Sequence, residues 1–312
     1  MHKSAFIYLA LTSVTFLWGT SFAAAKIGMH ELSPLNLVIF RFIIASIVFA
    51  TTLALVGRNN TIERIDFPKF FILGFLAITS YFFIQYTGLT YTTTINAALI
   101  IATSPIVTAL MGAVLGWEKI SREGCLGILL AFIGVSLIIT NGHLSGLFQS
   151  ATLPGDILLL FNAIVWAGFT LYGKTILQKY RPFTAMAYIH IFGTIMLLPL
   201  ALFSTKLAPQ PFINQILTIG WQTAGTAFYL AILCSVYGYY MWYTGIDRIG
   251  PVRTAVFNYL SPLFAILTGI WLLGENLTIY TVGGGLLIIV GVYLTNQFKH
   301  TKQDTSLIET TS

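Results

Sequence analysis

The chain has 312 residues, of which 56% are hydrophobic and only 8% carry a charge. Soluble proteins carry about 25% charged residues, so a water-soluble fold is excluded and an integral membrane protein is expected. The net charge of +6 does not indicate nucleic-acid binding, because the basic residues stand in small groups at the ends of apolar segments. Cys125 and Cys234 lie in apolar segments and offer neither a disulfide framework nor a metal site, so no cofactor is expected.

Apolar segments long enough to cross a bilayer follow one another along the whole chain. A helix needs about 20 apolar residues to span the hydrocarbon core. By this measure we predict ten membrane-spanning helices, and no connection between them is long enough to hold a soluble domain. The predicted spans are residues 5–25, 34–56, 69–89, 93–115, 124–141, 154–173, 183–203, 217–243, 251–273 and 279–298.

The first span has features of a signal peptide, since "MHKSAFIYLALTSVTFLWGTSFAAAK" has a basic start, an apolar run and an Ala-rich end. Two observations favour a retained helix instead. The apolar run has full membrane-spanning length. Its Trp18 and Lys26 also recur deep in the chain as Trp166 and Lys174, where no cleavable signal can stand.

The basic residues gather on one side of the predicted membrane. With ten spans both termini face the same side. If that side is the cytoplasm, only Lys26 and Lys206 fall outside, and Arg41 lies within a span. Cytoplasmic loops are enriched in Lys and Arg, so both termini are expected in the cytoplasm. The residues then expected inside are Lys3, Arg58, Arg64, Lys69, Lys119, Arg122, Lys174, Lys179, Arg181, Arg248, Arg253, Lys299 and Lys302.

The second half of the chain repeats the first. A shift of 157 residues aligns "YTGLTY" from Tyr86 with "YTGIDR" from Tyr243, and 16 of 52 aligned positions are identical. Chance identity is roughly one in ten for the narrow composition of membrane segments. A shift of 148 residues matches Trp18 with Trp166 nearer the start. The chain is therefore expected to hold two copies of a five-span unit.

The two copies are expected to cross the membrane in opposite directions, because five is an odd number. The flanking charges agree: "GWEKISREG" after the fourth span is basic, whereas its counterpart "GENLTIYT" after the ninth has neither Lys nor Arg. Before the same spans the imbalance reverses, with "TYTTTIN" uncharged and "DRIGPVR" carrying two arginines. Inverted repeats are typical of secondary transporters, in which two halves rock about a site near the middle of the membrane.

A proline interrupts the fourth and ninth spans at matching positions. Pro105 in "IIATSPIVTAL" and Pro262 in "FNYLSPLFAIL" each remove a helical hydrogen bond, and each follows a serine. Interrupted helices at corresponding places in two halves point to a transport site. The alternative is that both prolines only bend their helices for packing.

Polar and aromatic side chains at helical spacing mark a candidate pathway. Asn162 and Trp166, for example, stand four residues apart in the sixth span. Each side chain alone is also compatible with helix–helix packing or with the interfacial aromatic belt. Together they predict a cavity with aromatic walls and uncharged hydrogen-bonding groups. The candidate residues, beside the charged Arg41, are Trp18, Tyr81, Gln85, Asn96, Thr103, Pro105, Asn162, Trp166, Tyr237, Tyr240, Asn258, Ser261 and Pro262.

Ionisable residues within spans are candidates for function. Arg41, about two turns into the second span, could hold a carboxylate or phosphate, or its guanidinium could reach outward to the interface. His190 could carry a proton or serve only as a packed hydrogen-bonding group. Asp156 is expected at the outer mouth of the sixth span as a helix-start residue. No acidic residue precedes Glu31, so we expect a carrier without an evident proton-coupling residue.

The segments "FLWGTSFAAAKIGMHELSPLNLVIFRF", "SPIVTALMGAVLGWEKIS" and "SPLFAILTGIWLLGENLT" resemble the EamA family of the drug/metabolite transporter superfamily. The resemblance covers residues 5–298. It implies an all-α membrane protein, with ten transmembrane helices as two inverted five-helix repeats, in a bacterial inner membrane. Family members commonly export amino acids or related metabolites. In the second copy Ile189 stands in place of Arg41 and "WAGFT" replaces "WGTSF", which argues against a symmetric role for Arg41. The expected units are residues 1–145, residues 146–298 and a short polar cytoplasmic tail at 299–312.

The leading hypothesis is a secondary transporter that exports amino acids or related amphipathic compounds by alternating access around a midplane cavity. Efflux of hydrophobic drugs or other toxic compounds is the alternative. An enzyme is not expected, because neither "HExxH" nor "GxSxG" occurs and only one histidine lies within a span. The expected partners are a small-molecule substrate and the lipid bilayer, and ten spans suffice for a monomeric carrier. The substrate, coupling ion and direction of transport stay open.

Overall fold

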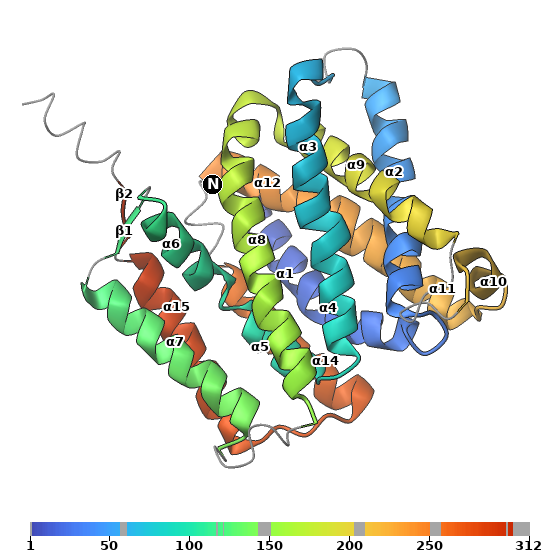
Figure 1. Cartoon of the computed structure of the whole chain (residues 1–312). Helices are drawn as coiled ribbons and strands as arrows, with labels where there is room; N and C mark the ends of the chain where they lie inside the picture. The colour runs from blue at the N-terminus through green and yellow to red at the C-terminus, as the bar shows by residue number, and fades with distance from the viewer. Residues whose placement is uncertain are drawn as a thin grey trace, which may run out of the picture.

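The computed structural model shows a bundle of helices (Figure 1). Lys206 and the last part of the predicted tail, residues 302–312, lie outside the described residues. The residues that the structure describes are 2–56, 61–116, 118–120, 122–142, 151–202, 210–249, 257–297 and 299–301.

The first half of the chain supplies five spans. Two are single helices, the third is a run of four helical segments, the fourth is divided in two, and the fifth is again a single helix. In chain order these are α1 (His2–Gly28), α2 (Pro34–Val56), η2 (Arg64–Asp66), α3 (Phe67–Gly74), η3 (Phe75–Ser80), α4 (Tyr81–Leu89), α5 (Thr94–Ile101), α6 (Ser104–Val114) and α7 (Arg122–Thr140).

The second half repeats this order and adds one short helix. Its elements are α8 (Leu153–Lys179), α9 (Pro182–Ala201), the short α10 (Phe212–Ile216), α11 (Trp221–Phe228), η5 (Tyr229–Tyr237), α12 (Gly238–Ile249), η6 (Phe257–Leu260), α14 (Ser261–Leu273) and α15 (Ile279–Gln297). Strands β1 (Glu118–Ile120) and β2 (Lys299–Thr301) pair antiparallel, with Glu118 opposite Thr301.

The predicted ten-span, all-helical architecture is confirmed. Within the described residues seven helical segments are long and apolar enough to cross a membrane, and α14 and α15 contain shorter apolar helices. The tenth is the unbroken helical run from Trp221 to Ile249, which ends beyond the predicted residue 243. In the described part of the chain, β1 and β2 form the one pair of strands, and the other regular elements are helical.

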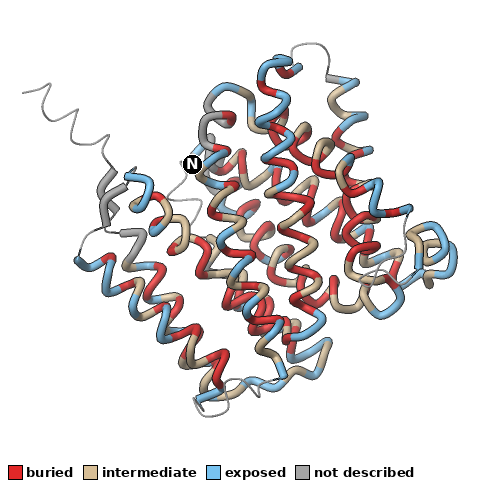
Figure 2. Tube along the Cα trace, in the orientation of Figure 1, coloured by how far each residue is buried: buried red, intermediate tan, exposed pale blue. Residues whose placement is uncertain are grey.

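Polarity is distributed as expected for a protein in lipid. Large apolar side chains such as Leu55, Val114 and Trp271 are exposed on the outside of the bundle, whereas Arg41 and Asn162 are buried inside. Figure 2 shows the buried residues on the faces that the helices turn toward one another. The exposed apolar surface is therefore the part that contacts the hydrocarbon core.

Helix contacts follow the symmetry of the repeat. Helix α1 packs against α14 and against α11, η5 and α12, and its counterpart α8 packs against α6 and against α4 and η3. Helices α2 and α9 pack on each other, as do α5 with α14 and α7 with α15. Exchanging the two repeats converts the α1–α14 contact into α8–α6 and the contacts of α1 with η5 and α12 into those of α8 with η3 and α4, and it maps the α2–α9 and α7–α15 pairs onto themselves. The packing thus has the pseudo-two-fold relation expected of a duplicated five-helix unit.

The pairing of α7 with α15 illustrates the symmetry at the atomic level. A Cβ atom on Gly134 would lie 2.5 Å from the Gly284 carbonyl oxygen, and one on Gly291 would clash with the Gly127 carbonyl oxygen. The shift of 157 residues converts the first contact into the second. Small residues let membrane helices approach closely enough for backbone contact.

Two π-helical segments occupy matching positions. Segment η3, in the third span, and segment η5, in the eighth, overlap when residues 75–80 are shifted by 157 to 232–237. Such segments are rare and are frequent at functional sites. In η5 the widened turn presents Cys234 and Ser235 to α1 and α2, which matters for the site described below.

Both proline interruptions coincide with a change of helix. Helix α5 ends at Ile101 and α6 begins at Ser104, while η6 gives way to α14 at Ser261. The Ile101 carbonyl oxygen, which Pro105 leaves without its helical partner, accepts a hydrogen bond from the Ser104 hydroxyl at 2.6 Å. Ser261 instead donates to the Thr15 carbonyl oxygen of α1 at 3.1 Å. The two breaks are equivalent in position but differ in their partners.

We call the two ends of the bundle the Lys26 end, where α8 begins, and the Lys179 end, where α8 finishes. At the Lys26 end Glu275 accepts hydrogen bonds from the Thr94 amide at 2.7 Å and the Ile95 amide at 3.1 Å, and pairs with Lys26 at 3.2 Å. A residue that follows α14 therefore caps the start of α5. The contact holds α1, α5 and α14 together at this end.

At the Lys179 end a second charge cluster joins α8 to the start of the third span. Lys179 pairs with Asp66 at 2.6 Å and with Glu63 at 2.8 Å, and the Tyr180 hydroxyl donates to Asp66 at 2.7 Å. The repeat shifts place Glu31 at the position of Lys179, and Gly220 and Thr223 at those of Glu63 and Asp66.

The equivalent contact at the Lys26 end exists with a different chemistry. Glu31 accepts a hydrogen bond from the Gly220 amide at 2.9 Å. The Thr223 hydroxyl and this amide hold the pKa of Glu31 below its usual range. One repeat thus uses a lysine and two carboxylates where the other uses a carboxylate at a helix N-terminus.

Candidate functional site

Arg41 occupies the interior of the bundle. Its side chain leaves α2 and is only 3% exposed. The Nε atom donates to the Ser235 hydroxyl at 2.9 Å, and an Nη atom donates to the Tyr86 hydroxyl at 2.7 Å. Because both partners lie inside the bundle, the guanidinium does not reach outward to the interface, which was the alternative left open by the sequence.

The surroundings of Arg41 contain aromatic rings rather than a carboxylate. The guanidinium carbon lies 4.4 Å from the centroid of the Phe82 ring and 5.2 Å from that of Phe42. In the part of the chain that the structure describes, no carboxylate forms an ion pair with Arg41. Neutral hydrogen bonds and cation–π contacts hold the cation without cancelling its charge.

Trp18 approaches the Arg41 cluster from α1. Its indole Nε1 donates to the Cys234 carbonyl oxygen at 3.0 Å, one residue before Ser235 in η5. Its ring lies 5.5 Å from that of Tyr239 and 5.0 Å from that of Trp242, centroid to centroid. The indole fits there because residue 238 is glycine: a Cβ atom at Gly238 would lie 2.8 Å from Nε1.

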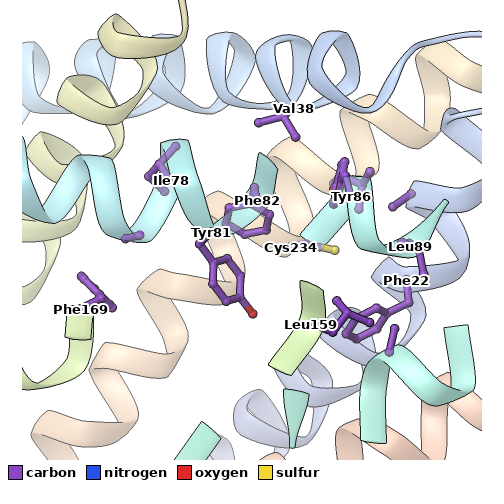
Figure 3. Close-up of a cluster of buried hydrophobic side chains, with 14 of the residues drawn as sticks. Phe22, Val38, Ile78, Tyr81, Phe82, Tyr86, Leu89, Leu159, Phe169 and Cys234 are labelled. Atoms are coloured by element: carbon purple, nitrogen blue, oxygen red, sulfur yellow. The ribbon is translucent and has the colours of Figure 1, made fainter. Parts of the chain in front are cut away.

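Tyr81 extends the aromatic cluster toward α8. Its ring centroid lies 4.9 Å from that of Phe82 and 4.9 Å from that of Trp166. Figure 3 shows Tyr81, Phe82 and Tyr86 leaving the η3–α4 helix in different directions, so that one helix serves both Arg41 and Trp166. Contacts thereby connect four predicted residues, one each from α1, α2, α4 and α8: Trp18, Arg41, Tyr81 and Trp166. We call these residues and their direct partners the central group.

Two buried amides lie one helical turn from the Tyr81–Trp166 contact. Gln85 follows Tyr81 by four residues on α4, and Asn162 precedes Trp166 by four residues on α8. Helices α4 and α8 run antiparallel, so both amides lie on the Lys26 side of the ring contact. Within the described residues Gln85 Oε1 and both polar atoms of Asn162 have no hydrogen-bond partner. Buried amides without partners are costly, and a ligand or water is the usual explanation.

In the part of the chain that the structure describes, the other predicted residues make no hydrogen bond or ring contact with the central group. The Thr103 hydroxyl donates to the Ile100 carbonyl oxygen at 2.6 Å, so it serves its own helix. Tyr237 shares a 2.9 Å hydrogen bond with Ser13, and Tyr240 is 45% exposed and packs on Phe183. Asn96 is buried in α5, and Pro105, Asn258, Ser261 and Pro262 lie at the breaks of the fourth and ninth spans.

Several members of the group were not among the predicted site residues. Tyr86, Ser235 and Phe82 contact Arg41 directly, yet nothing in the sequence context of Ser235 and Phe82 distinguishes these two from packing residues. A signal was available for Tyr86, because it opens the "YTG" segment that both repeats share. His190 donates from Nδ1 to the Met186 carbonyl oxygen at 2.8 Å, the tautomer that the carbonyl requires, and its Nε2 has no partner within the described residues.

No metal centre accompanies these residues. In the described ranges no group of three or more His, Cys, Asp or Glu side chains could hold a metal ion. A hollow of about 450 Å³ lies elsewhere, between α2, α9 and α10, and is lined by apolar side chains that include Ile43, Leu198 and Phe212. None of the predicted site residues lines it. The hollow therefore belongs to the lipid-facing side of the bundle.

The fold and the central group define the class of the protein: a multi-pass membrane transporter of two inverted five-helix repeats. The model of the EamA-like transporter family matches residues 5–140 and again residues 153–297, so the chain belongs to this family and is not an enzyme. The resemblance seen in the sequence is thus confirmed. The unit boundaries expected at residues 145 and 298 stay a prediction.

Relatives cover more than nine-tenths of the chain. A protein named "Uncharacterized transporter" from Archaeoglobus fulgidus is 35% identical, over 96% of this chain and 100% of its own. A "Probable amino-acid metabolite efflux pump" from Salmonella typhimurium is 30% identical, over 92% and 93%. A "Probable terminal-alkyne amino-acid exporter" from Streptantibioticus cattleyicolor is 25% identical, over 93% and 92%. A solved crystal structure covering 93% of this chain and 96% of its own aligns with a TM-score of 0.64 at 19% identity, and shows the fold alone.

Proposed function

We propose that the protein exports amino acids or closely related amphipathic metabolites across the cell membrane, by alternating access about the central group. The observation that carries the proposal is Arg41, a buried cation held by neutral partners and aromatic rings. A buried charge is strongly disfavoured unless it is paired. The carboxylate of the substrate supplies the pair, and the two-donor fork of a guanidinium suits a carboxylate.

The remaining groups match the rest of an amino acid. The rings of Trp18, Tyr239 and Trp242 offer faces for an apolar side chain or for the ammonium group, which aromatic rings attract. The free amide oxygens of Gln85 and Asn162 can accept from an ammonium N–H. The names of the Salmonella and Streptantibioticus relatives are in keeping with an amino-acid substrate.

Efflux of hydrophobic drugs is the second candidate, because aromatic walls also bind apolar compounds. Arg41 disfavours it, since a fixed positive charge repels the cationic compounds that many such pumps carry and is left unpaired by neutral ones.

Under the proposal of amino-acid export, the Lys179 end faces the cytoplasm and the substrate is released at the Lys26 end. A monomer suffices for the proposed cycle, since both repeats lie in one chain.

Counterflow in proteoliposomes tests the proposal. Vesicles are loaded with the twenty amino acids, and exchange of each is read by mass spectrometry against empty vesicles. We expect exchange of one chemical group of amino acids. Arg41→Gln should raise KM for that group by about tenfold to a hundredfold, the loss of one charge-assisted contact of roughly 1.5–3 kcal/mol. Arg248→Gln, which removes an exposed arginine, is the matched control.

Two outcomes contradict the proposal. Exchange of dyes or drugs without exchange of any amino acid moves the function to drug efflux. An unchanged KM in Arg41→Gln removes Arg41 from substrate binding. Should Arg41→Gln not fold, Ser235→Ala, which deletes one hydrogen bond to the guanidinium, should still raise KM severalfold.

A further inference from the structure

Helices α4 and α8 are held together at two points. At the first, the ring centroids of Tyr81 and Trp166 lie 4.9 Å apart. At the second, the helices approach so closely that a Cβ atom on Gly88 would lie 3.2 Å from the Cγ atom of Leu159. The side chains between these two points are therefore enclosed by the contact of the two helices.

Each helix places one amide between the two points. Gln85 follows Tyr81 by four residues and Asn162 precedes Trp166 by four, so each amide shares a helix face with one of the contacting rings. Asn162 is fully buried and Gln85 is 6% exposed. Within the described residues, Gln85 Oε1 and both Oδ1 and Nδ2 of Asn162 have no hydrogen-bond partner. The pair thus offers two acceptor oxygens and one donor NH₂ group.

The second repeat builds the same helix contact without amides. The equivalent of the α4–α8 contact is that of α12 with α1, where a Cβ atom on Gly245 would lie 2.8 Å from the Cδ2 atom of Leu11. The repeat shifts of 157 and 148 residues place Trp242 and Val14 at the positions of the two amides. Because this contact packs with apolar side chains at both positions, helix packing does not require the amides. Their unpartnered polar atoms call for a ligand instead.

The amides lie next to the site proposed for the substrate carboxylate. Phe82, whose ring centroid lies 4.4 Å from the guanidinium carbon of Arg41, precedes Gln85 by three residues on α4. Side chains three residues apart are neighbours on a helix surface, with about 5–6 Å between their Cβ atoms. One molecule of the size of an amino acid can therefore reach the guanidinium with one end and the amides with the other.

A carboxamide matches the three unpartnered atoms. Its NH₂ group donates one hydrogen to each of the two oxygens, and its carbonyl oxygen accepts from Nδ2 of Asn162. An ammonium group only donates, so it leaves Nδ2 without an acceptor. A hydroxyl has one hydrogen for two oxygens, and a carboxylate directs its negative charge at both. An apolar side chain leaves all three atoms unpaired.

We propose that Gln85 and Asn162 bind the side-chain carboxamide of the transported molecule and make the carrier selective for amino acids such as asparagine and glutamine. Arg41 then holds the carboxylate of the substrate, and the ammonium group is left to the aromatic rings of the central group. The inference rests on the proposed function for the rest of the substrate, but the amide site has a readout of its own.

Counterflow of amino acids of matched shape tests the selectivity. Asparagine and leucine have side chains of similar shape, but only asparagine carries hydrogen-bonding groups. A site built to hydrogen-bond a substrate group rejects an analogue that lacks it, so the wild type should prefer asparagine by at least about tenfold in the ratio of maximal rate to KM. Asn162→Leu should remove this preference. Asn214→Leu, the same change at an exposed amide of α10, should keep it.

Thermal stability separates a ligand-binding amide from a structural one. Replacing an unpartnered buried amide by an apolar residue of similar shape removes a desolvation penalty. Asn162→Leu should therefore melt at or above the wild-type temperature in detergent. Asparagine should raise the melting temperature of the wild type and of Asn214→Leu but not that of Asn162→Leu. A lower melting temperature of Asn162→Leu with an unchanged substrate preference would assign the amide to the fold and overturn the inference.

The remaining outcomes also decide between the two proposals. Should Asn162→Leu not fold, Gln85→Met, which removes one acceptor oxygen, should still reduce the preference for asparagine severalfold, and an unchanged preference overturns the inference. Equal exchange of asparagine and leucine by the wild type refutes the amide site alone. The absence of any amino-acid exchange refutes the proposed function. In that case the melting temperatures decide: a shift with asparagine that is lost in Asn162→Leu supports the amide site, and no shift in the wild type overturns it.

Discussion

At the scale of single residues, the site depends on small side chains as much as on polar ones. Gly238 leaves the room that the Trp18 indole occupies beside the Cys234 carbonyl oxygen. The indole donates a hydrogen bond to Cys234, and the next residue, Ser235, accepts one from Arg41. The glycine at the start of α12 thus lets the Trp18 side chain of α1 pack against η5, next to the residue that binds Arg41 of α2.

Gly238→Ala should displace the indole, because the added Cβ would lie 2.8 Å from its Nε1. Overpacking of this kind costs about 1–3 kcal/mol. We expect a lower rate of counterflow and a lower melting temperature in detergent, measured by tryptophan fluorescence.

Gly168→Ala is the matched control, since a Cβ atom there meets nothing within 4 Å. An alanine at an open helical position stabilises by about 1 kcal/mol relative to glycine. Equal behaviour of the two variants would show that Trp18 does not need the space at Gly238.

At the scale of elements, the α7–α15 pair lies apart from the central group. Its contact is built from glycines of both repeats and contains no member of the central group. Helices α1, α2, α4 and α8 supply Trp18, Arg41, Tyr81 and Trp166. We therefore expect α7 and α15 to support the fold without taking part in substrate binding.

Gly284→Ala should test this division of roles. The new Cβ would lie 2.6 Å from the Gly134 carbonyl oxygen, so the two backbones must separate. The melting temperature should fall, whereas KM for the exchanged amino acid should not change in the folded fraction.

The neighbouring Gly283→Ala is the control, because nothing lies within 4 Å of a Cβ atom at that position. It should be at least as stable as the wild type, with an unchanged KM. A raised KM in Gly284→Ala alone would instead connect the α7–α15 pair to the substrate site.

At the scale of the whole molecule, the contacts at the two ends are related by the repeat but differ in charge. The Lys179 end carries Lys179 and Lys69 beside Asp66 and Glu63, whereas the Lys26 end carries the single Lys26 beside Glu275 and the helix-capping Glu31. Basic residues prefer the cytoplasmic side. The distribution of charge therefore favours the Lys179 end as the cytoplasmic one.

Cysteine labelling in intact cells tests this orientation. In a background without the exposed Cys125, Asn214→Cys at the Lys26 end should react with a membrane-impermeant maleimide added outside. Glu63→Cys at the Lys179 end should react only after the membrane is opened. The reverse pattern would invert the proposed direction of export.

The sequence alone determined the membrane setting, the ten spans and the inverted repeat, because composition, span length and internal identity are local or additive properties of the chain. It also singled out Trp18, Arg41, Tyr81 and Trp166, whose residue types are unusual or recurrent in their spans. It could not show that Arg41 bonds to Tyr86 and Ser235, residues 45 and 194 positions away. Nor could it show that Asp156, expected at an outer mouth, is buried. The hydrogen-bond partners and the burial of a side chain depend on which distant helices pack around it, so only the tertiary structure decided them.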